Sequence, residues 1–218
     1  MTISSTKIIL ASPPHTGSTP LLNLVHGFLM PEEPRHWCTE RLIDQFMITK
    51  THQLNLDGWE EKYPHYNLYF VMSERNDDKM SRTICEKEKK KKNVLVVDYP
   101  EMLVTPEQSL NHMIETMYEK FVNFFPKEII PLGKNKTQIK QAMLERFTKM
   151  NQCVEEFKDK PWNICEDFYG IHGGHRNRQL DVNSYIFISG EHDEEAEKIR
   201  LNEYYGKKKE LVVEKKSN

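Results

Sequence analysis

Short apolar runs, each ended by polar or turn residues, are the first feature of the chain. Four of them are only four or five residues long: Lys7–Ala11, Phe46–Thr49, Leu68–Met72 and Val94–Val97. Continuous apolar runs of this length are typical of strands that are buried on both faces of a parallel sheet. They therefore predict four core strands.

Longer segments between and after these runs have the helical period instead. Apolar residues recur on one face of Pro106–Phe125, a proline stands in its first turn, and Lys136–Phe157 is a further predicted helix. A helix is also expected directly after the first strand, with the apolar residues Leu21, Leu22, Leu24, Val25 and Phe28. Strands alternating with helices predict a three-layer α/β fold, with a mainly parallel central sheet flanked by helices. Ligands of such folds bind at the carboxyl ends of the strands.

The end of the chain is less regular. Tyr185–Ile188 is predicted as an added edge strand and Glu191–Tyr204 as a last helix. We expect a single domain over residues 1–206, followed by a polar, flexible tail over residues 207–218.

Composition narrows the classes of function. The 218 residues carry a net charge of only −2, so there is no global basic field of the kind that recruits nucleic acid. No apolar stretch approaches the roughly 20 residues of a membrane helix, so no membrane anchor is expected. The start of the chain lacks the pattern of a secretory signal, which predicts a cytoplasmic location.

Two local features have simple interpretations. The four cysteines lack C-x-x-C spacing, which favours reduced, buried thiols over a zinc site or a redox pair. The basic run Glu86–Lys92 is either a solvated turn or a contact for an anionic partner.

The turn after the first strand contains the first candidate chemistry. Residues 12–19 read Ser-Pro-Pro-His-Thr-Gly-Ser-Thr and lead from a strand into a helix. Such a turn presents backbone N–H groups and a helix N-terminus, which suit an anion, although a plain tight turn is the simpler alternative. A nucleoside triphosphate loop needs a glycine where Ser12 stands and a lysine where Ser18 stands, so a nucleotide kinase is disfavoured.

This loop resembles that of the sulfotransferases that use 3′-phosphoadenosine 5′-phosphosulfate (PAPS). Their pattern is P-K-[ST]-G-[ST]-[ST], and the matching residues here are Pro14, His15, Thr16, Gly17, Ser18 and Thr19. The resemblance implies a P-loop-like loop that binds the 5′-phosphosulfate of the donor. His15 replaces the lysine that normally helps to neutralise the transferring group, which leaves His15 as a candidate catalytic residue.

Lys50-Thr51-His52 is similar to the K-T-H triplet at the end of the family's next core strand. Sulfuryl transfer needs a base for the proton of the acceptor and a cation for the charge on the leaving phosphate. His52, with an ordinary pKa of about 6.5, can be that base, and Lys50 can be the cation. A structural, hydrogen-bonded histidine is the alternative for His52.

The third predicted strand is followed by Arg75-Asn76, which resembles the family's strand that ends in Arg-Asn and leads into a helix. In the family, the arginine and a hydroxyl eight residues later hold the 3′-phosphate. Here the hydroxyl is Thr83, with Ser81 as a substitute. A surface salt bridge from Arg75 to Asp77 or Asp78 is the alternative.

Two later segments complete the resemblance. Tyr99 stands where the family has a tyrosine near the adenine, although an aromatic residue at a strand end is equally a core residue. A glycine-rich segment is similar to the family's G-x-x-G-x-W-K-N motif, which closes over the 3′-phosphate. Its implied donor-binding residues are Gly170, Gly173, Gly174, His175, Arg176, Asn177 and Arg178. A metal site at His172 and His175 lacks a third ligand at suitable spacing, so no metal is expected.

The resemblance therefore implies a PAPS-dependent sulfotransferase that releases the bisphosphate PAP and acts on a hydroxyl or amine of a small molecule or glycan. Residues 30–42 are expected to contribute to the acceptor region, where Trp37 either lines the site or anchors the core. A module that binds PAP or PAPS with weak or lost transferase activity is the alternative that the His15 substitution allows.

Overall fold

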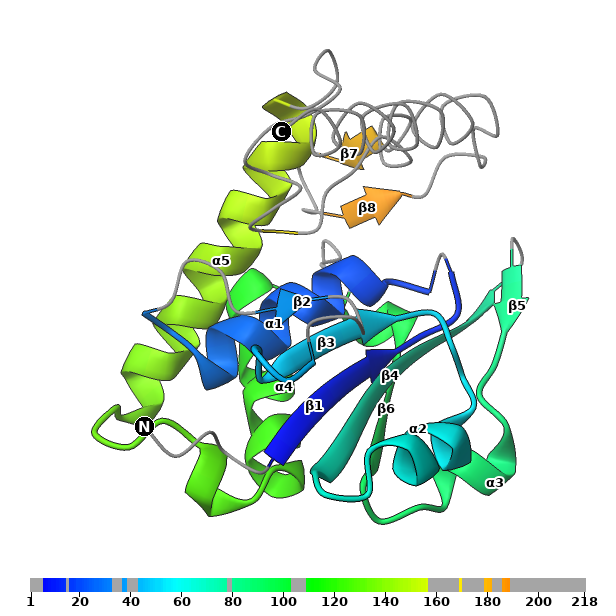
Figure 1. The fold of residues 1–218 in the computed structure, drawn as a ribbon. Helices are drawn as coiled ribbons and strands as arrows, with labels where there is room; N and C mark the ends of the chain where they lie inside the picture. The colour runs from blue at the N-terminus through cyan, green and yellow to red at the C-terminus, as the bar shows by residue number, and fades with distance from the viewer. Residues whose placement is uncertain are drawn as a thin grey trace, which may run out of the picture.

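A mostly parallel sheet with helices against both of its faces forms the centre of the chain (Figure 1). This computed structural model describes residues 6–14, 16–32, 37–38, 43–77, 80–102, 109–156, 169, 179–181 and 186–188. The chain is thus an α/β protein, as the alternation of apolar runs predicts.

Six strands form this sheet, in the order β2-β3-β1-β4-β5, and β6 also pairs with β4. All pairs are parallel except β4 with β5. The strands are β1 (Thr6–Ala11), β2 (Trp37–Cys38), β3 (Ile48–Thr51), β4 (Asn67–Asp77), β5 (Met80–Arg82) and β6 (Val94–Asp98). Because β1 lies between β3 and β4, the loop after β1 starts next to the ends of both neighbours.

Each face of the sheet has its own apolar core. Along β1, Ile8 and Leu10 face one core, whereas Ile9 and Ala11 face the other, as the alternation of side chains along a strand requires. The first core also includes the helices α1 (Ser18–Leu29), α4 (Leu110–Phe124) and α5 (Lys136–Glu156), and the second includes α2 (Leu56–Lys62). The remaining short helices are α3 (Glu86–Lys89), η2 (Tyr99–Met102) and η3 (Lys127–Ile129).

The helix ends follow from local chemistry. Asn135 and Gln138 cap the start of α5 reciprocally, because each side-chain oxygen accepts a hydrogen bond of 3.0 Å from the backbone N–H of the other. Ser109 caps α4 by accepting from the N–H of His112 at 3.2 Å.

Gly27 lets α1 approach α5 closely, because a Cβ there would lie 2.8 Å from the Cα of Met143.

The four predicted core strands are confirmed, with changes at their ends. The strand near Phe46–Thr49 begins later, at Ile48, and the one at Leu68–Met72 extends in both directions to become β4. The helix predicted over Lys136–Phe157 is confirmed as α5, and α4 matches the predicted helix from Leu110 onward.

Two topological expectations are wrong. The chain after Arg75 and Asn76 does not enter a helix, because β4 continues to Asp77 and pairs with β5. Tyr185–Ile188 does not add an edge to the central sheet. Its described part, β8 (Ile186–Ile188), pairs with β7 (Gln179–Asp181) in a separate two-stranded sheet. The predicted helix over 191–204 and the tail over 207–218 lie outside the described residues.

The lysines of the basic run 86–92 belong largely to ion pairs within the chain. Lys87 pairs with Asp57 at 2.7 Å, and Lys89 pairs with Glu74 at 2.8 Å. Lys91 contacts Asp57 at 2.5 Å and Glu60 at 3.3 Å. The run therefore ties α2 and β4 to the segment before β6, which favours a structural role over a contact with an anionic partner.

The prediction of reduced, buried thiols is wrong for two cysteines. Cys153 is disulfide-bonded, and Cys85 is a free thiol but is exposed. Disulfides are typical of oxidising compartments, so Cys153 weighs against the predicted cytoplasmic location. Among the described residues, no helix is long and apolar enough to cross a membrane.

Candidate functional site

The loop between β1 and α1 is the centre of the candidate site. Gly17 caps α1 with φ 85°, a left-handed conformation that glycine adopts without strain. The positive end of a 12-residue helix therefore begins at the loop, an arrangement that can hold an anion. Thr16, Ser18 and Thr19 are buried, and Pro14 is exposed. His15, the proposed catalytic substitute for lysine, lies outside the described residues.

The end of β3 brings a cation to the first turn of α1. Leu10 and Lys50 are neighbours in the parallel pairing of β1 with β3. From this position the Lys50 Nζ donates a hydrogen bond of 2.8 Å to the Oγ1 of Thr19. The structure thus joins two residues that the sequence assigned to one site, although 31 positions separate them.

His52 follows β3 and contacts the start of the same loop. Its Nδ1 lies 2.7 Å from the backbone carbonyl oxygen of Ser12. A carbonyl oxygen only accepts hydrogen bonds, so Nδ1 carries the proton, and neutral His52 has an unprotonated Nε2. His52 can therefore be both a structural, hydrogen-bonded residue and a general base. Nδ1 anchors the ring, and Nε2 is the nitrogen that can accept a proton.

Arg75 and Tyr99 come together at the ends of β4 and β6. The guanidinium carbon of Arg75 lies 4.6 Å from the centre of the Tyr99 ring, and Arg75 is only 5% exposed. The ring also packs on the loop, because a Cβ on Gly17 would lie 2.7 Å from Tyr99 Cδ2 and 2.8 Å from Met102 Cε. Tyr99 is thus a core residue and a neighbour of the loop at the same time.

The two candidate hydroxyls after Arg75 are less closely tied to it. Ser81 lies on β5 opposite Asn76, while Arg75 itself is opposite Arg82. Both Ser81 and Thr83 are exposed. The neighbouring Arg82 donates through Nη1 to the carbonyl oxygen of Pro14 at 2.9 Å, so β5 contacts the loop through a residue that the sequence analysis did not select.

Two carboxyl groups directly precede Arg75 and Tyr99 in the chain. Glu74 and Asp98 are neighbours in the pairing of β4 with β6, and their side chains hydrogen-bond to one another. Burial opposes ionisation of Glu74, but hydrogen bonds from Lys89 and from the N–H of Ile84 outweigh it and lower the pKa of Glu74. Burial and the Glu74 carboxyl group raise the pKa of Asp98. This pair was missed because Glu74 and Asp98 match no motif.

The glycine-rich segment from Gly170 to Arg178 lies outside the described residues. Its neighbour Tyr169 is described. Asn23 on α1 donates through Nδ2 to the carbonyl oxygens of Tyr169 and Thr19, at 2.9 Å in both cases. The residue before this segment is therefore held at the first turn of α1, where the loop ends.

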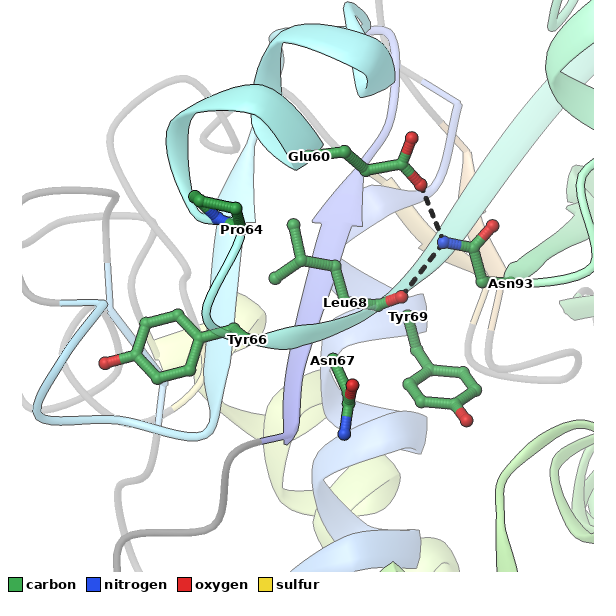
Figure 2. Close-up of a pocket in the computed structure, with 7 residues that line it drawn as sticks. All are labelled: Glu60, Pro64, Tyr66, Asn67, Leu68, Tyr69 and Asn93. Carbon is green, nitrogen blue, oxygen red and sulfur yellow. Dashed lines mark hydrogen bonds between the residues drawn. The ribbon is translucent and has the colours of Figure 1, made fainter.

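A hollow of about 500 Å³ lies at the opposite end of β4 (Figure 2). Figure 2 shows Glu60 and Asn93 joined by a hydrogen bond, which measures 2.9 Å. The lining residues are Glu60, Pro64, Tyr66, Asn67, Leu68, Tyr69 and Asn93. None of these seven carries a positive charge, and Leu68 precedes Ser73 by five strand positions, or about 16 Å at 3.3 Å per residue. This hollow is therefore not the candidate anion site.

No group of three or more potential metal-binding side chains occurs among the described residues. His172 and His175, the candidate metal ligands, are outside that part of the chain.

No protein-family model matches this chain, and no curated protein matches it.

Proposed function

We propose that this protein is a PAPS-dependent sulfotransferase. The single observation that supports it most is the meeting of three elements at the carboxyl ends of adjacent parallel strands. These are the Gly17 loop after β1, the Lys50 and His52 side chains after β3, and Arg75 near the end of β4. The proposed P-loop-like role of the loop rests on the same arrangement.

The side chains fit the charges of the donor. The loop and the N-terminus of α1 suit the 5′-phosphosulfate, and Lys50, whose Nζ lies 2.8 Å from the Oγ1 of Thr19, is the proposed cation for the charge on the 5′-phosphate. Arg75 supplies a planar cation for the 3′-phosphate. The Tyr99 ring beneath Arg75 offers an aromatic surface near the proposed adenine position.

In the proposed reaction, the acceptor oxygen or nitrogen forms a bond to sulfur while the bond from sulfur to the phosphate oxygen breaks. The proton of the acceptor moves to Nε2 of His52, since Nδ1 is already protonated and bound to the Ser12 carbonyl. The phosphate keeps the electrons of the broken bond, and its negative charge is balanced by Lys50. The acceptor is a hydroxyl or amine of a small molecule or glycan.

Replacing His52 by Ala tests this role. We expect a loss of turnover of about 10²- to 10⁴-fold, the usual contribution of a general base, while calorimetry still detects binding of PAP. His65→Ala is the matched control, because His65 is an exposed histidine near the opposite end of β4. The assay uses radiolabelled PAPS with a panel of hydroxyl and amine acceptors, small molecules and glycans.

Turnover that survives in His52→Ala would exclude His52 as the base. The second candidate function is a PAP- or PAPS-binding module without efficient transfer, which the replacement of the usual loop lysine by His15 favours. That module would bind PAP but transfer nothing to any acceptor in the panel. Binding of ATP in place of PAP would instead favour a nucleotide kinase.

A further inference from the structure

Ser12, the first residue after β1, uses three polar groups to connect three segments. Its N–H donates to the carbonyl oxygen of Thr51 at the end of β3, at 3.3 Å. Its Oγ accepts from the N–H of Ser73 on β4, at 2.9 Å. Its carbonyl oxygen accepts from the Nδ1 of His52, at 2.7 Å. No motif in the sequence analysis selected Ser12 for this position.

The two serines are shielded from water, whereas His52 is exposed. Ser12 and Ser73 are both 0% exposed, so each of their polar groups needs a partner within the protein. Hydrogen bonds in such surroundings are costly to break, because a buried donor left without an acceptor keeps its full desolvation penalty. The Ser12 carbonyl oxygen is therefore held in one place, and it gives the Nδ1 of His52 a fixed acceptor.

Ser73 extends the same connection to the loop. Its Oγ lies 2.9 Å from the Oγ1 of Thr16, and Thr16 in turn donates to the carbonyl oxygen of Pro13 at 2.8 Å. Thr16 has one hydroxyl proton and uses it for Pro13, so Ser73 is the donor to Thr16. The path from His52 to the loop thus runs through Ser12, Ser73 and Thr16.

We propose that Ser12 is a positioning residue that fixes the orientation and the tautomer of His52, and that Ser73 links this residue to the loop. The tautomer follows from the geometry alone, whereas its catalytic consequence rests on the proposed function. Ser12 determines which ring nitrogen accepts a proton, and Ser73 holds Thr16 within the loop. The two serines therefore affect different steps, the proton transfer and the binding of the donor.

The first test needs no activity. A long-range ¹H–¹⁵N correlation spectrum of the full chain at pH 8.5 identifies the protonated nitrogen of His52, and the His52→Gln variant assigns its signals. We expect protonation at Nδ1 in the unmodified protein, and also in Ser12→Ala, because alanine keeps the backbone carbonyl that accepts the bond from Nδ1. Protonation at Nε2 in the unmodified protein would overturn the proposal.

The second test separates the two serines. Ser12→Ala keeps the carbonyl oxygen but removes the Oγ that accepts from the N–H of Ser73, so we expect the end of β1 to shift together with the imidazole bound to it. A misplaced base transfers protons poorly, so kcat should fall about 10-fold and its pH dependence should shift. Ser73→Ala keeps the backbone N–H that Ser12 accepts, so we expect weaker binding of PAP with an unchanged pH profile. If both variants lose kcat and PAP affinity to the same extent, the two serines have a merely structural role. That result would refute the assignment of Ser12 to proton transfer and of Ser73 to donor binding.

The matched pair Thr16→Val and Thr16→Ser checks the link to the loop. Valine keeps the volume of threonine without the hydroxyl, while serine keeps the hydroxyl. We expect PAP affinity to fall in Thr16→Val and to be largely retained in Thr16→Ser. Equal affinities in the two variants would show that the bond from Ser73 to Thr16 does not shape the loop. If no acceptor is sulfated by any form, the proposed function fails, yet the tautomer result stands by itself.

Discussion

The guanidinium carbon of Arg75 lies 4.6 Å from the centre of the Tyr99 ring, at the ends of two neighbouring parallel strands. The contact stacks a planar cation on an aromatic face, and the same ring packs against Gly17 of the loop. Arg75, Tyr99 and the loop therefore pack together, and a substitution at one of them is expected to alter the packing of the other two.

Arg75→Lys is expected to weaken the binding of PAP about 10-fold. Lysine keeps the charge but loses the planar, bidentate geometry and the stacking on Tyr99. Calorimetry with PAP measures the effect, and Tyr99→Phe is the control because it keeps the ring. Unchanged affinity in Arg75→Lys would contradict the assignment of Arg75 to the 3′-phosphate.

Gly17→Ala should lower the free energy of unfolding by about 2 kcal/mol or more. It combines left-handed strain at φ 85° with a Cβ that would lie 2.7 Å from the Tyr99 ring. Gly133→Ala is a matched control, because Gly133 also has φ 85° but a Cβ there would have no neighbour within 4 Å. We expect the control to lose only about 1 kcal/mol from strain. Urea unfolding compares the two variants, and equal losses would show that the contact with Tyr99 costs nothing.

Replacing Asp98 by Asn should stabilise the protein at pH 7.5 and have little effect at pH 3.5. The pKa of Asp98 is raised in the folded state, so its stabilising contribution is present below its unfolded pKa and is lost as the pH rises through the folded pKa. An amide stays neutral throughout this range. Thermal melts at both pH values test the prediction, and a lower Tm at pH 7.5 would contradict it.

Glu74→Gln should have the opposite pH dependence. The pKa of Glu74 is lowered in the folded state, so its contribution is present above the unfolded pKa and is lost as the pH falls through the folded value. The substitution also removes the charge partner of Lys89, which lies 2.8 Å away. We therefore expect a lower Tm at pH 7.5 and a smaller difference at pH 3.5, measured in the same melts.

Cys85 and Cys153 should differ in their reaction with iodoacetamide. Cys85 is exposed and free, so it is expected to be alkylated without a reductant. Cys153 is disulfide-bonded and is expected to react only after reduction. Peptide mass spectrometry before and after treatment with dithiothreitol distinguishes the two sites. Alkylation of Cys153 in the untreated protein would disprove its disulfide.

The apolar runs of the chain determined the α/β class by themselves. Uninterrupted segments such as Leu68–Met72 are typical of strands covered on both faces, and the spacing of Met113, Ile114, Met117 and Phe121 is typical of one buried helix face. These patterns are local, so they can be read without knowing which segments meet. The sequence also places the loop, Lys50, His52 and Arg75 after successive apolar runs. This order indicated that these residues lie at the ends of strands.

The tertiary structure alone decided how those residues contact one another. Ser12 bonds to His52 from 40 positions away, and Thr16 bonds to Ser73 from 57 positions away, because β1 pairs with both β3 and β4. Arg75 leads into a hairpin instead of a helix, since the backbone of β4 finds hydrogen-bond partners on β5. Strands pair through backbone N–H and C=O groups, which nearly every residue carries. The pattern of side chains therefore does not predict which strands pair.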